Sequence, residues 1–327
     1  MFLINDFRQQ INLKNIISLH ESVLLILLIF SLTILSIQSD KFFNADNLLN
    51  QGRLLAEVGL VALPMTMIII TGGIDLSVGS IMGLCAIVLG YSWKNIGLPL
   101  EIAIIFTLLI GVSSGAINGL FINRVRVPPL IMTLATMAFF RGLAEGISKA
   151  RSVRGYPEWF YFIGQGEILG IPVQVLILAL SIMIFSYLLS KTVFGRSLYA
   201  IGHNEVGSRF SGIPVNRFKL YIYSLSGLMS GIAAVVFVSR VSTTRSDMGS
   251  GLELDVIAAV VLGGTSIFGG IGSILGTVLG FILIQLLKNG LALTGVKGDA
   301  TIMVIGLVLI ISILISNLLK KFYPTNS

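Results

Sequence analysis

The sequence has few charged residues and a single cysteine, and each scarcity excludes a class of protein. Only 11% of the 327 residues are charged, whereas a soluble domain needs about a quarter of its residues charged to hydrate its surface. A soluble enzyme is therefore excluded. The lone cysteine, Cys85, excludes an intrachain disulfide and a metal site built from several cysteines.

Several enzyme and binding motifs are also absent from the sequence. There is no G-x-x-x-x-G-K-[ST] phosphate loop, so we do not expect the chain itself to bind ATP in the usual way. We find no nucleophile elbow, no paired His/Glu motif and no cofactor-binding motif. The net charge of +7 comes without a basic cluster interleaved with aromatics, which argues against nucleic-acid binding. We predict a chain with no catalytic residue, metal or cofactor of its own, powered by a partner or an ion gradient.

Long apolar runs are what the sequence has in abundance. Nine uncharged runs contain 14 to 32 residues each, and a helix needs about 20 mostly apolar residues to cross a bilayer. The longest run is interrupted by glycines, so we divide it into two spans. The shortest is extended to about residue 147, because Arg141 and Glu145 are four apart and can pair on a helix. The runs are Ser22–Ser39, Val58–Ile74, Leu76–Trp93, Ile102–Asn123, Val127–Phe140, Ile168–Ser190, Leu220–Ser239, Val256–Leu287 and Ala300–Leu319. We predict an all-α, polytopic membrane protein with about ten transmembrane helices and two Gly-rich broken regions.

The segments outside these runs predict the organisation of the chain. Ten spans place both termini on one side, which we expect to be the cytoplasmic side of the membrane. Residues 1–21 and 320–327 would be cytoplasmic, residues 22–319 a single transmembrane domain, and 192–218 its main cytoplasmic loop. The first run lacks a clean cleavage site, so we expect a retained span. The basic residues divide equally between the two sides, eleven and eleven, so orientation does not follow from charge alone.

Two glycine-rich segments of the chain resemble each other. Gly72-Gly73 and Gly263-Gly264 are each followed by a short insert and a G-S-x-x-G sequence that opens the next apolar stretch. Irregular backbone at membrane depth is tolerated only where protein or a water-filled cavity satisfies it. Broken helices in repeated halves indicate a transport pathway. The alternative is that small residues here merely permit close helix packing.

Three polar residues in or beside apolar runs are candidates for a role. Asp75 is expensive at membrane depth, and two roles stay open for it. With Ser77 it would accept hydrogen bonds at a helix start, or it would contact the solute or a coupling ion. Asn118 would line a pore or hydrogen-bond between helices. Glu57 is expected to reach the membrane interface and is assigned no function.

The polar loop after residue 191 predicts one short helix. Asn204 is a suitable N-cap, and Gly212 followed by Pro214 is a suitable stop. Eight helical residues are marginal alone in water, so we expect this helix to lie on the membrane surface or in a groove of a partner protein. His203 has no second ligand nearby, and metal binding is not expected.

Taken together, these segments resemble the membrane permease subunit of ATP-binding-cassette importers for monosaccharides, of the ribose/xylose/arabinose type. The resemblance covers about residues 54–319. Residues 61–67 and 245–247 look more like the autoinducer-2 and rhamnose branches. His203 and Gly207-Ser208 depart from the common pattern. The motifs that carry the resemblance are Thr71-Gly72-Gly73-Ile74-Asp75-Leu76-Ser77-Val78-Gly79, Asn118-Gly119, Thr133-Leu134-Ala135-Thr136 with Arg141-Gly142, Gly195-Arg196 with Ala200-Ile201-Gly202 and Asn204, and Glu253-Leu254-Asp255 with Gly263-Gly264-Thr265.

The resemblance implies a pore-forming subunit that translocates a small sugar or sugar-like solute of the ribose, rhamnose or autoinducer-2 class. Its partners would be a second permease copy or a sister permease, two cytoplasmic ATPase domains that use ATP and Mg²⁺, an extracytoplasmic solute-binding protein, and lipid. The coupling residues would be Gly195, Arg196, Gly202, Asn204, Glu205, Arg209 and Gly212. The pore and broken-helix residues would be Gly72, Gly73, Asp75, Ser77, Asn118, Gly263 and Gly264. The docking residues for the binding protein would be Arg245, Asp247 and Glu253. The alternative function is an ion-coupled secondary transporter that uses Asp75.

Overall fold

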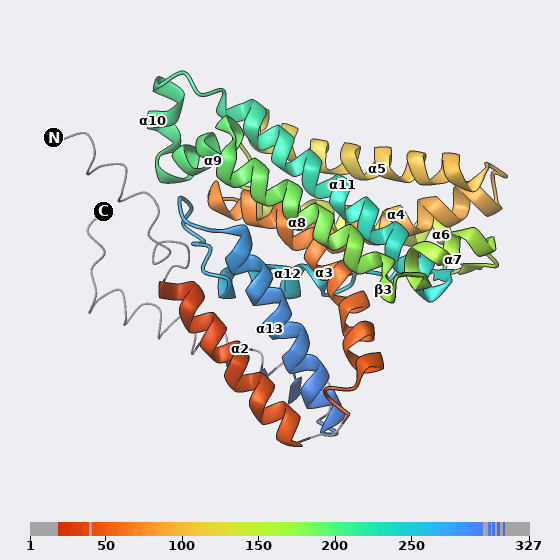
Figure 1. The fold of residues 1–327 in the computed structure, drawn as a ribbon. Helices are drawn as coiled ribbons and strands as arrows, with labels where there is room; N and C mark the ends of the chain where they lie inside the picture. Colours follow the sequence, from red (N-terminus) through yellow and green to blue (C-terminus); the bar gives the residue numbers. More distant parts are fainter. Residues whose placement is uncertain are drawn as a thin grey trace.

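The computed structural model describes residues 19–38, 41–296, 300–301, 303–304, 306–307 and 310. Over these residues the chain is a bundle of long helices with short strand pairs at one end (Figure 1). The helices are α2 (Leu19–Gln38), α3 (Ala45–Ile70), α4 (Val78–Lys94), α5 (Leu100–Leu120) with its π-helical extension η3 (Phe121–Val125), α6 (Pro129–Ser148), α7 (Glu158–Gln165), α8 (Val173–Lys191), α9 (Val193–His203), α10 (Glu205–Phe210), α11 (Val215–Val241), α12 (Leu252–Leu262) and α13 (Ile274–Leu293). The strands are β1 (Val153–Arg154), β2 (Glu167–Ile168), β3 (Ile171–Pro172) and β4 (Thr243–Thr244).

The apolar runs predicted from the sequence become helices in the described part of the chain. Among the described residues, six helices are long and apolar enough to cross a membrane: α3, α5 with η3, α6, α8, α11 and α13. The prediction of a polytopic helical membrane protein is therefore confirmed, while the number of about ten spans stays a prediction. α4 is a shorter apolar helix of 17 residues, and α12 has only 11. The run predicted at 300–319 lies mostly outside the described residues.

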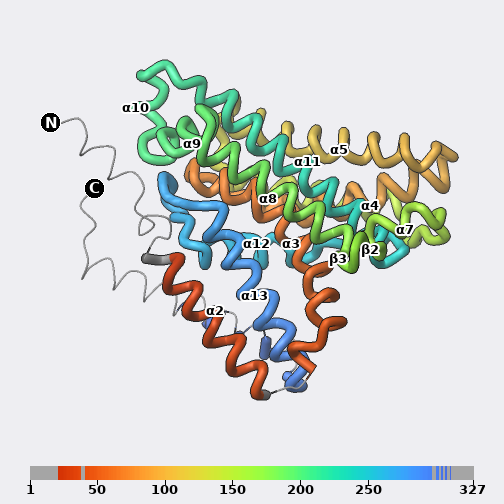
Figure 2. The backbone as a smooth tube through the Cα atoms, in the orientation of Figure 1, coloured from red at the N-terminus to blue at the C-terminus, as the bar shows by residue number. Residues whose placement is uncertain are grey.

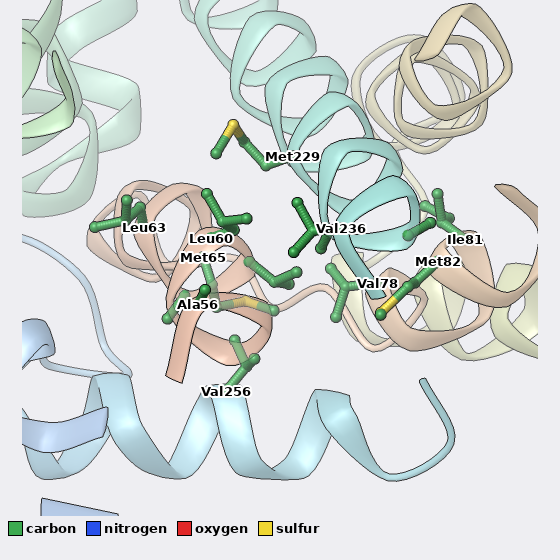
Figure 3. Packing of buried hydrophobic residues seen from close by; sticks show 14 of the residues in the cluster. Ala56, Leu60, Leu63, Met65, Val78, Ile81, Met82, Met229, Val236 and Val256 are labelled. Atoms are coloured by element: carbon green, nitrogen blue, oxygen red, sulfur yellow. The ribbon is translucent and has the colours of Figure 1, made fainter. Parts of the chain in front are cut away.

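The interior of the bundle is built on α3 and α11. In these helices 78% and 72% of the most apolar stretch is buried, compared with 22% in both α6 and α8. Apolar side chains on the outer helices therefore face outward, as expected for helices in contact with lipid. Figure 3 shows the core, where side chains from four helices meet. They are Ala56, Leu60, Leu63 and Met65 of α3, Val78, Ile81 and Met82 of α4, Met229 and Val236 of α11, and Val256 of α12.

Small residues let α5 and α11 approach each other closely. A Cβ atom on Gly227 would lie 2.0 Å from the carbonyl oxygen of Gly111, and one on Gly115 would lie 2.0 Å from that of Tyr223. Neither position has room for a side chain, so the two backbones are in direct contact. Close packing of this kind is typical of membrane helices, where apolar burial does not drive association.

The two ends of the bundle differ in structure, and the tube drawing shows both (Figure 2). At the strand end, β1 pairs antiparallel with β4, and β2 with β3. At the opposite end lie α9 and α10, and we call it the α9–α10 end. The segment 71–77 begins at this end and the loop 263–273 lies there, because the N–H of Gly270 donates to the carbonyl of Ile70 beside α9. η3 joins them, since Asn123 donates to the carbonyl of Asn216.

Candidate functional site

A buried polar cluster surrounds Asp75 where α3 gives way to α4. Its carboxylate accepts hydrogen bonds from the N–H of Ser77 at 3.0 Å, the hydroxyl of Ser77 at 2.6 Å and the hydroxyl of Ser226 at 3.2 Å. The hydroxyl of Ser77 accepts from the amide of Asn118 at 2.8 Å, and Asn118 accepts from Thr136, also at 2.8 Å. All five residues are buried. The cluster thus joins segment 71–77 to α5, α6 and α11.

The geometry favours a structural role for Asp75 and does not test the alternative, direct contact with the solute or a coupling ion. Three donors satisfy the buried carboxylate, as a polar group removed from water requires. The carboxylate holds Ser77, the residue before α4, and the side chain of Ser77 makes no capping bond of its own. Asp75 therefore stabilises the turn that leads into α4 through Ser77, not an N–H within the helix. Direct contact of Asp75 with solute or ion stays a prediction.

The two glycine pairs both follow the end of a helix. α3 ends at Ile70 and α12 at Leu262, and in each pair one glycine takes a left-handed conformation, Gly72 at φ 76° and Gly264 at φ 88°. Such a residue commonly ends a helix. The partner glycines are closely packed: a Cβ on Gly73 would lie 2.7 Å from the Tyr223 hydroxyl, and one on Gly263 would lie 2.6 Å from the backbone of Gly276. In each pair, therefore, one glycine lets the helix end and the other allows close packing.

The segment before α12 folds back along α4 and meets its first turn. A Cβ on Gly79 would lie 2.2 Å from the carbonyl oxygen of Gly249 and 2.3 Å from a carboxylate oxygen of Glu253. Arg141 of α6 fixes this approach, since its guanidinium donates to the carbonyls of Ser246, Met248 at 2.9 Å and Gly79 at 3.3 Å. The starts of α4 and α12 therefore lie side by side inside the bundle.

Two expectations about charged residues are corrected by the structure. No ion pair joins Arg141 to Glu145 in the described part of the chain; Arg141 turns to the backbone carbonyls beside α12 instead. Glu57 does not reach the interface. It is buried and accepts from the Nε of Arg240 on α11 at 2.6 Å. In both cases the partner lies far along the chain, where local spacing gives no signal. The available signs were an acid directly before one apolar run and a base directly after another.

The three residues predicted to face a binding protein separate into two groups. Arg245 and Asp247 pair with each other on an exposed loop next to β4 at the strand end. The hydrogen bond from Arg245 outweighs slight desolvation and lowers the pKa of the Asp247 carboxyl. Glu253 is only partly exposed and turns toward Gly79. An accessible surface at this loop therefore rests on Arg245 and Asp247.

The predicted short helix is present as α10. The side chain of Asn204 caps it by accepting from the N–H of Gly207 at 2.8 Å, and Gly212 follows it in a left-handed conformation at φ 81°. The cap and stop predicted from the sequence are thus confirmed as local structure. Glu205 accepts from Arg209 at 2.7 Å and from Lys219 at 2.6 Å, which ties α10 to the first turn of α11.

The charge and exposure of α10 fit a contact surface. Burial raises the pKa of the Glu205 carboxyl, but the hydrogen bonds and charges of its two cationic partners outweigh this, and the pKa is lowered. Val206 is 62% exposed and Phe210 88%. Arg209 of α10 and Arg196 of α9 are also exposed. Apolar side chains on a six-residue helix gain nothing by facing water, so this surface fits either contact predicted for it, with the membrane surface or with a partner protein.

The two predicted glycines of α9, Gly195 and Gly202, face the bundle instead of this exposed surface. A Cβ on Gly195 would lie 1.9 Å from the carbonyl oxygen of Leu189 at the end of α8. One on Gly202 would lie 1.9 Å from the carbonyl oxygen of Ile70 at the end of α3. α9 is therefore held against two long helices by direct backbone contact, while α10 projects from the bundle (Figure 1).

Comparisons with known proteins agree with this architecture. Residues 46–313 match a family described as the branched-chain amino acid transport system / permease component. The ribose import permease protein of Bacillus subtilis (strain 168) is 44% identical over 285 residues, which cover 86% of this chain and 88% of the relative. The autoinducer 2 import system permease protein of Escherichia coli (strain K12) is 40% identical over 260 residues, 78% of each chain. No solved structure matches the chain.

Proposed function

The chain belongs to the branched-chain amino acid transport system / permease component family, and from this premise we propose that it is the pore-forming permease subunit of an ATP-driven sugar importer. The observation that carries the proposal is the similarity to the ribose and autoinducer 2 permeases, which extends over most of both chains. The helical bundle with its apolar outer face supports it, because such a surface requires a lipid environment.

The solute would be a small sugar or sugar-like molecule of the ribose, rhamnose or autoinducer-2 class. The names of the two relatives support ribose and autoinducer 2 within this range. Two copies of the chain, or this chain with a sister permease, would enclose the pathway, and each would cross the membrane in about ten segments, several of them discontinuous. α4 and α12, whose starts meet inside the bundle, support the discontinuous spans.

Energy would come from two ATPase domains that bind ATP and Mg²⁺ and dock on α9 and α10. The exposed residues Arg196, Val206, Arg209 and Phe210 support this contact. The α9–α10 end would then be cytoplasmic, as would both termini, in the plasma membrane. The opposite strand end, with Arg245 and Asp247 exposed, would receive an extracytoplasmic solute-binding protein. The chain itself would catalyse no reaction.

The proposal is tested by uptake of radiolabelled ribose in cells that produce the chain with its ATPase and solute-binding protein. We expect uptake to stop when the ATPase is inactivated and to continue when a protonophore collapses the ion gradients while ATP stays high. The converse result, uptake that is lost with the gradient and indifferent to the ATPase, would establish an ion-coupled secondary transporter instead. Autoinducer 2 serves as the second solute if ribose is not taken up.

A further inference from the structure

Three segments that are distant in sequence meet in backbone contact at the α9–α10 end. They are the last turn of α3, the last turn of α9 and the loop between α12 and α13. The N–H of Gly270 in that loop donates to the carbonyl oxygen of Ile70 at 2.8 Å. A Cβ on Gly202 of α9 would lie 1.9 Å from the same carbonyl oxygen and 2.4 Å from the nitrogen of Gly270. We call this contact the Ile70–Gly202–Gly270 junction.

Neighbouring residues lock the junction on the side of the loop. The hydroxyl of Tyr199, one turn earlier in α9, donates to the carbonyl of Gly272 at 2.7 Å. Gly269 and Gly270 take left-handed conformations, at φ 90° and φ 78°, which L-residues with a Cβ rarely adopt. A Cβ on Gly270 would lie 2.0 Å from the Nδ1 of His203. α9 is therefore seated on the loop by both of its last two turns.

This arrangement places α9 against both glycine-rich segments at once. Ile70 is the last residue of α3, and the chain continues directly into segment 71–77 and the Asp75 cluster. Gly270 and Gly272 lie in the loop that leads into α13. Packed backbones separated by van der Waals distance do not yield independently, so a shift of one is passed to the others. A movement of α9 must displace the two segments together or break the contact.

We propose that the Ile70–Gly202–Gly270 junction transmits displacement of α9 to segments 71–77 and 263–273 simultaneously. Gly202 and Tyr199 are positioning residues in this scheme. The proposal rests on the proposed function, because docked ATPase domains would impose the displacement through α10. It assigns Gly202 a transmission role in addition to the close packing that its lack of a Cβ allows.

The test is uptake per ATP hydrolysed by the complete complex in lipid vesicles, with ribose as solute. Gly202→Ala forces a Cβ into the junction and should lower this ratio by about tenfold, since overpacking separates the backbones. Tyr199→Phe adds no atom and removes one hydrogen bond, and it should lower the ratio by about fivefold. Gly146→Ala is the matched control, because Gly146 lies in α6 with nothing within 4 Å of its Cβ position. It should leave the ratio unchanged.

A second measurement does not depend on the solute. Amide hydrogen exchange in the complex, compared without nucleotide and with ATP and vanadate, should change in both segments 71–77 and 263–273. In Tyr199→Phe that nucleotide-dependent change should fall by roughly half or more, while exchange in α10 keeps its response. If Gly202→Ala prevents assembly, Tyr199→Phe decides the outcome in both measurements.

The proposal is overturned if Tyr199→Phe and an assembled Gly202→Ala complex keep the wild-type ratio. It is equally overturned if nucleotide changes exchange in only one of the two segments of the wild-type complex. Either result leaves the proposed function intact, because wild-type uptake still requires ATP. Failure of the proposed function looks different: the wild-type chain would bind no ATPase, and the displacement that the junction is proposed to transmit would not arise.

Discussion

Replacing Asp75 separates a structural role for this carboxylate from a role in ion coupling. Asp75→Ala removes the acceptor of three buried hydrogen bonds, two from Ser77 and one from Ser226. A buried donor left without a partner costs about 1–3 kcal/mol. The hydroxyl of Ser226 can rotate to a carbonyl of the preceding turn of α11, whereas the N–H and the hydroxyl of Ser77 lie in a non-helical turn and lose their acceptor. We therefore expect Asp75→Ala to lower the unfolding free energy by about 3 kcal/mol.

Asp75→Asn is the matched variant for the same position. Its amide oxygen still accepts from Ser77, and its amide nitrogen donates to the hydroxyl of Ser226, which can reverse its own hydrogen bond. The loss should be about 1 kcal/mol, the difference between a charged and a neutral acceptor. Asn keeps the hydrogen bonds but cannot ionise. If Asp75 is structural, we expect Asp75→Asn to retain most of the transport activity. An ion-coupling carboxylate would lose transport altogether.

The assay is denaturant titration of the purified full chain in mixed micelles, together with uptake in the complete complex. An unfolding free energy of Asp75→Ala within about 0.5 kcal/mol of the wild-type value would contradict the structural role of Asp75, because surface substitutions have effects of that size. Equal destabilisation by Ala and Asn would also refute it, because the acceptor oxygen would then be irrelevant. Wild-type stability of Asp75→Asn without any uptake would favour the ion-coupled alternative.

Three further predictions concern contacts elsewhere in the bundle. Glu57→Gln leaves the partly buried Arg240 without its counter-ion, so the unfolding free energy should fall by about 1–3 kcal/mol. A loss smaller than that of the double variant Glu57→Gln, Arg240→Met would contradict the pairing. Gly227→Ala should cost about 1–3 kcal/mol in the same titration, because its Cβ meets the carbonyl of Gly111, and unchanged stability would show that the two helices are not in backbone contact. The lowered pKa of Glu205 means that its ion pairs are fully present above the ordinary value of 4.5 and are lost as the pH falls through the lowered pKa. The mobility of a spin label on α10 should stay constant as the pH falls to 4.5 and should rise as the pH falls further, through the lowered pKa. A transition near neutral pH would contradict the ion pairs.

Local patterns in the sequence predicted the parts of this fold that depend on local forces. Apolar runs predicted the helices because burial in lipid depends on composition over about 20 residues. The cap at Asn204 and the left-handed Gly212 were readable because both act within one helical turn.

Contacts between distant segments could not be predicted in the same way. Arg141 and Ser246 are 105 residues apart, and Glu57 and Arg240 are 183 apart. No local pattern specifies which base meets which acid over such a separation. The sequence favoured the nearby Glu145 as the partner of Arg141 for that reason, and the fold brought the segment before α12 to it instead. The glycine repeat was visible, but the contact of Gly202 with Ile70 and Gly270 required the folded backbone.

We propose that the chain is a permease whose movement is driven by ATP hydrolysed in partner subunits. The most direct test is ribose uptake by lipid vesicles that contain the complete complex, with ATP supplied to the α9–α10 side and no ion gradient across the membrane. We expect concentrative uptake that stops when ATP is removed or the ATPase is omitted. Concentrative uptake by the purified chain alone, driven by an imposed ion gradient without ATP, would contradict it.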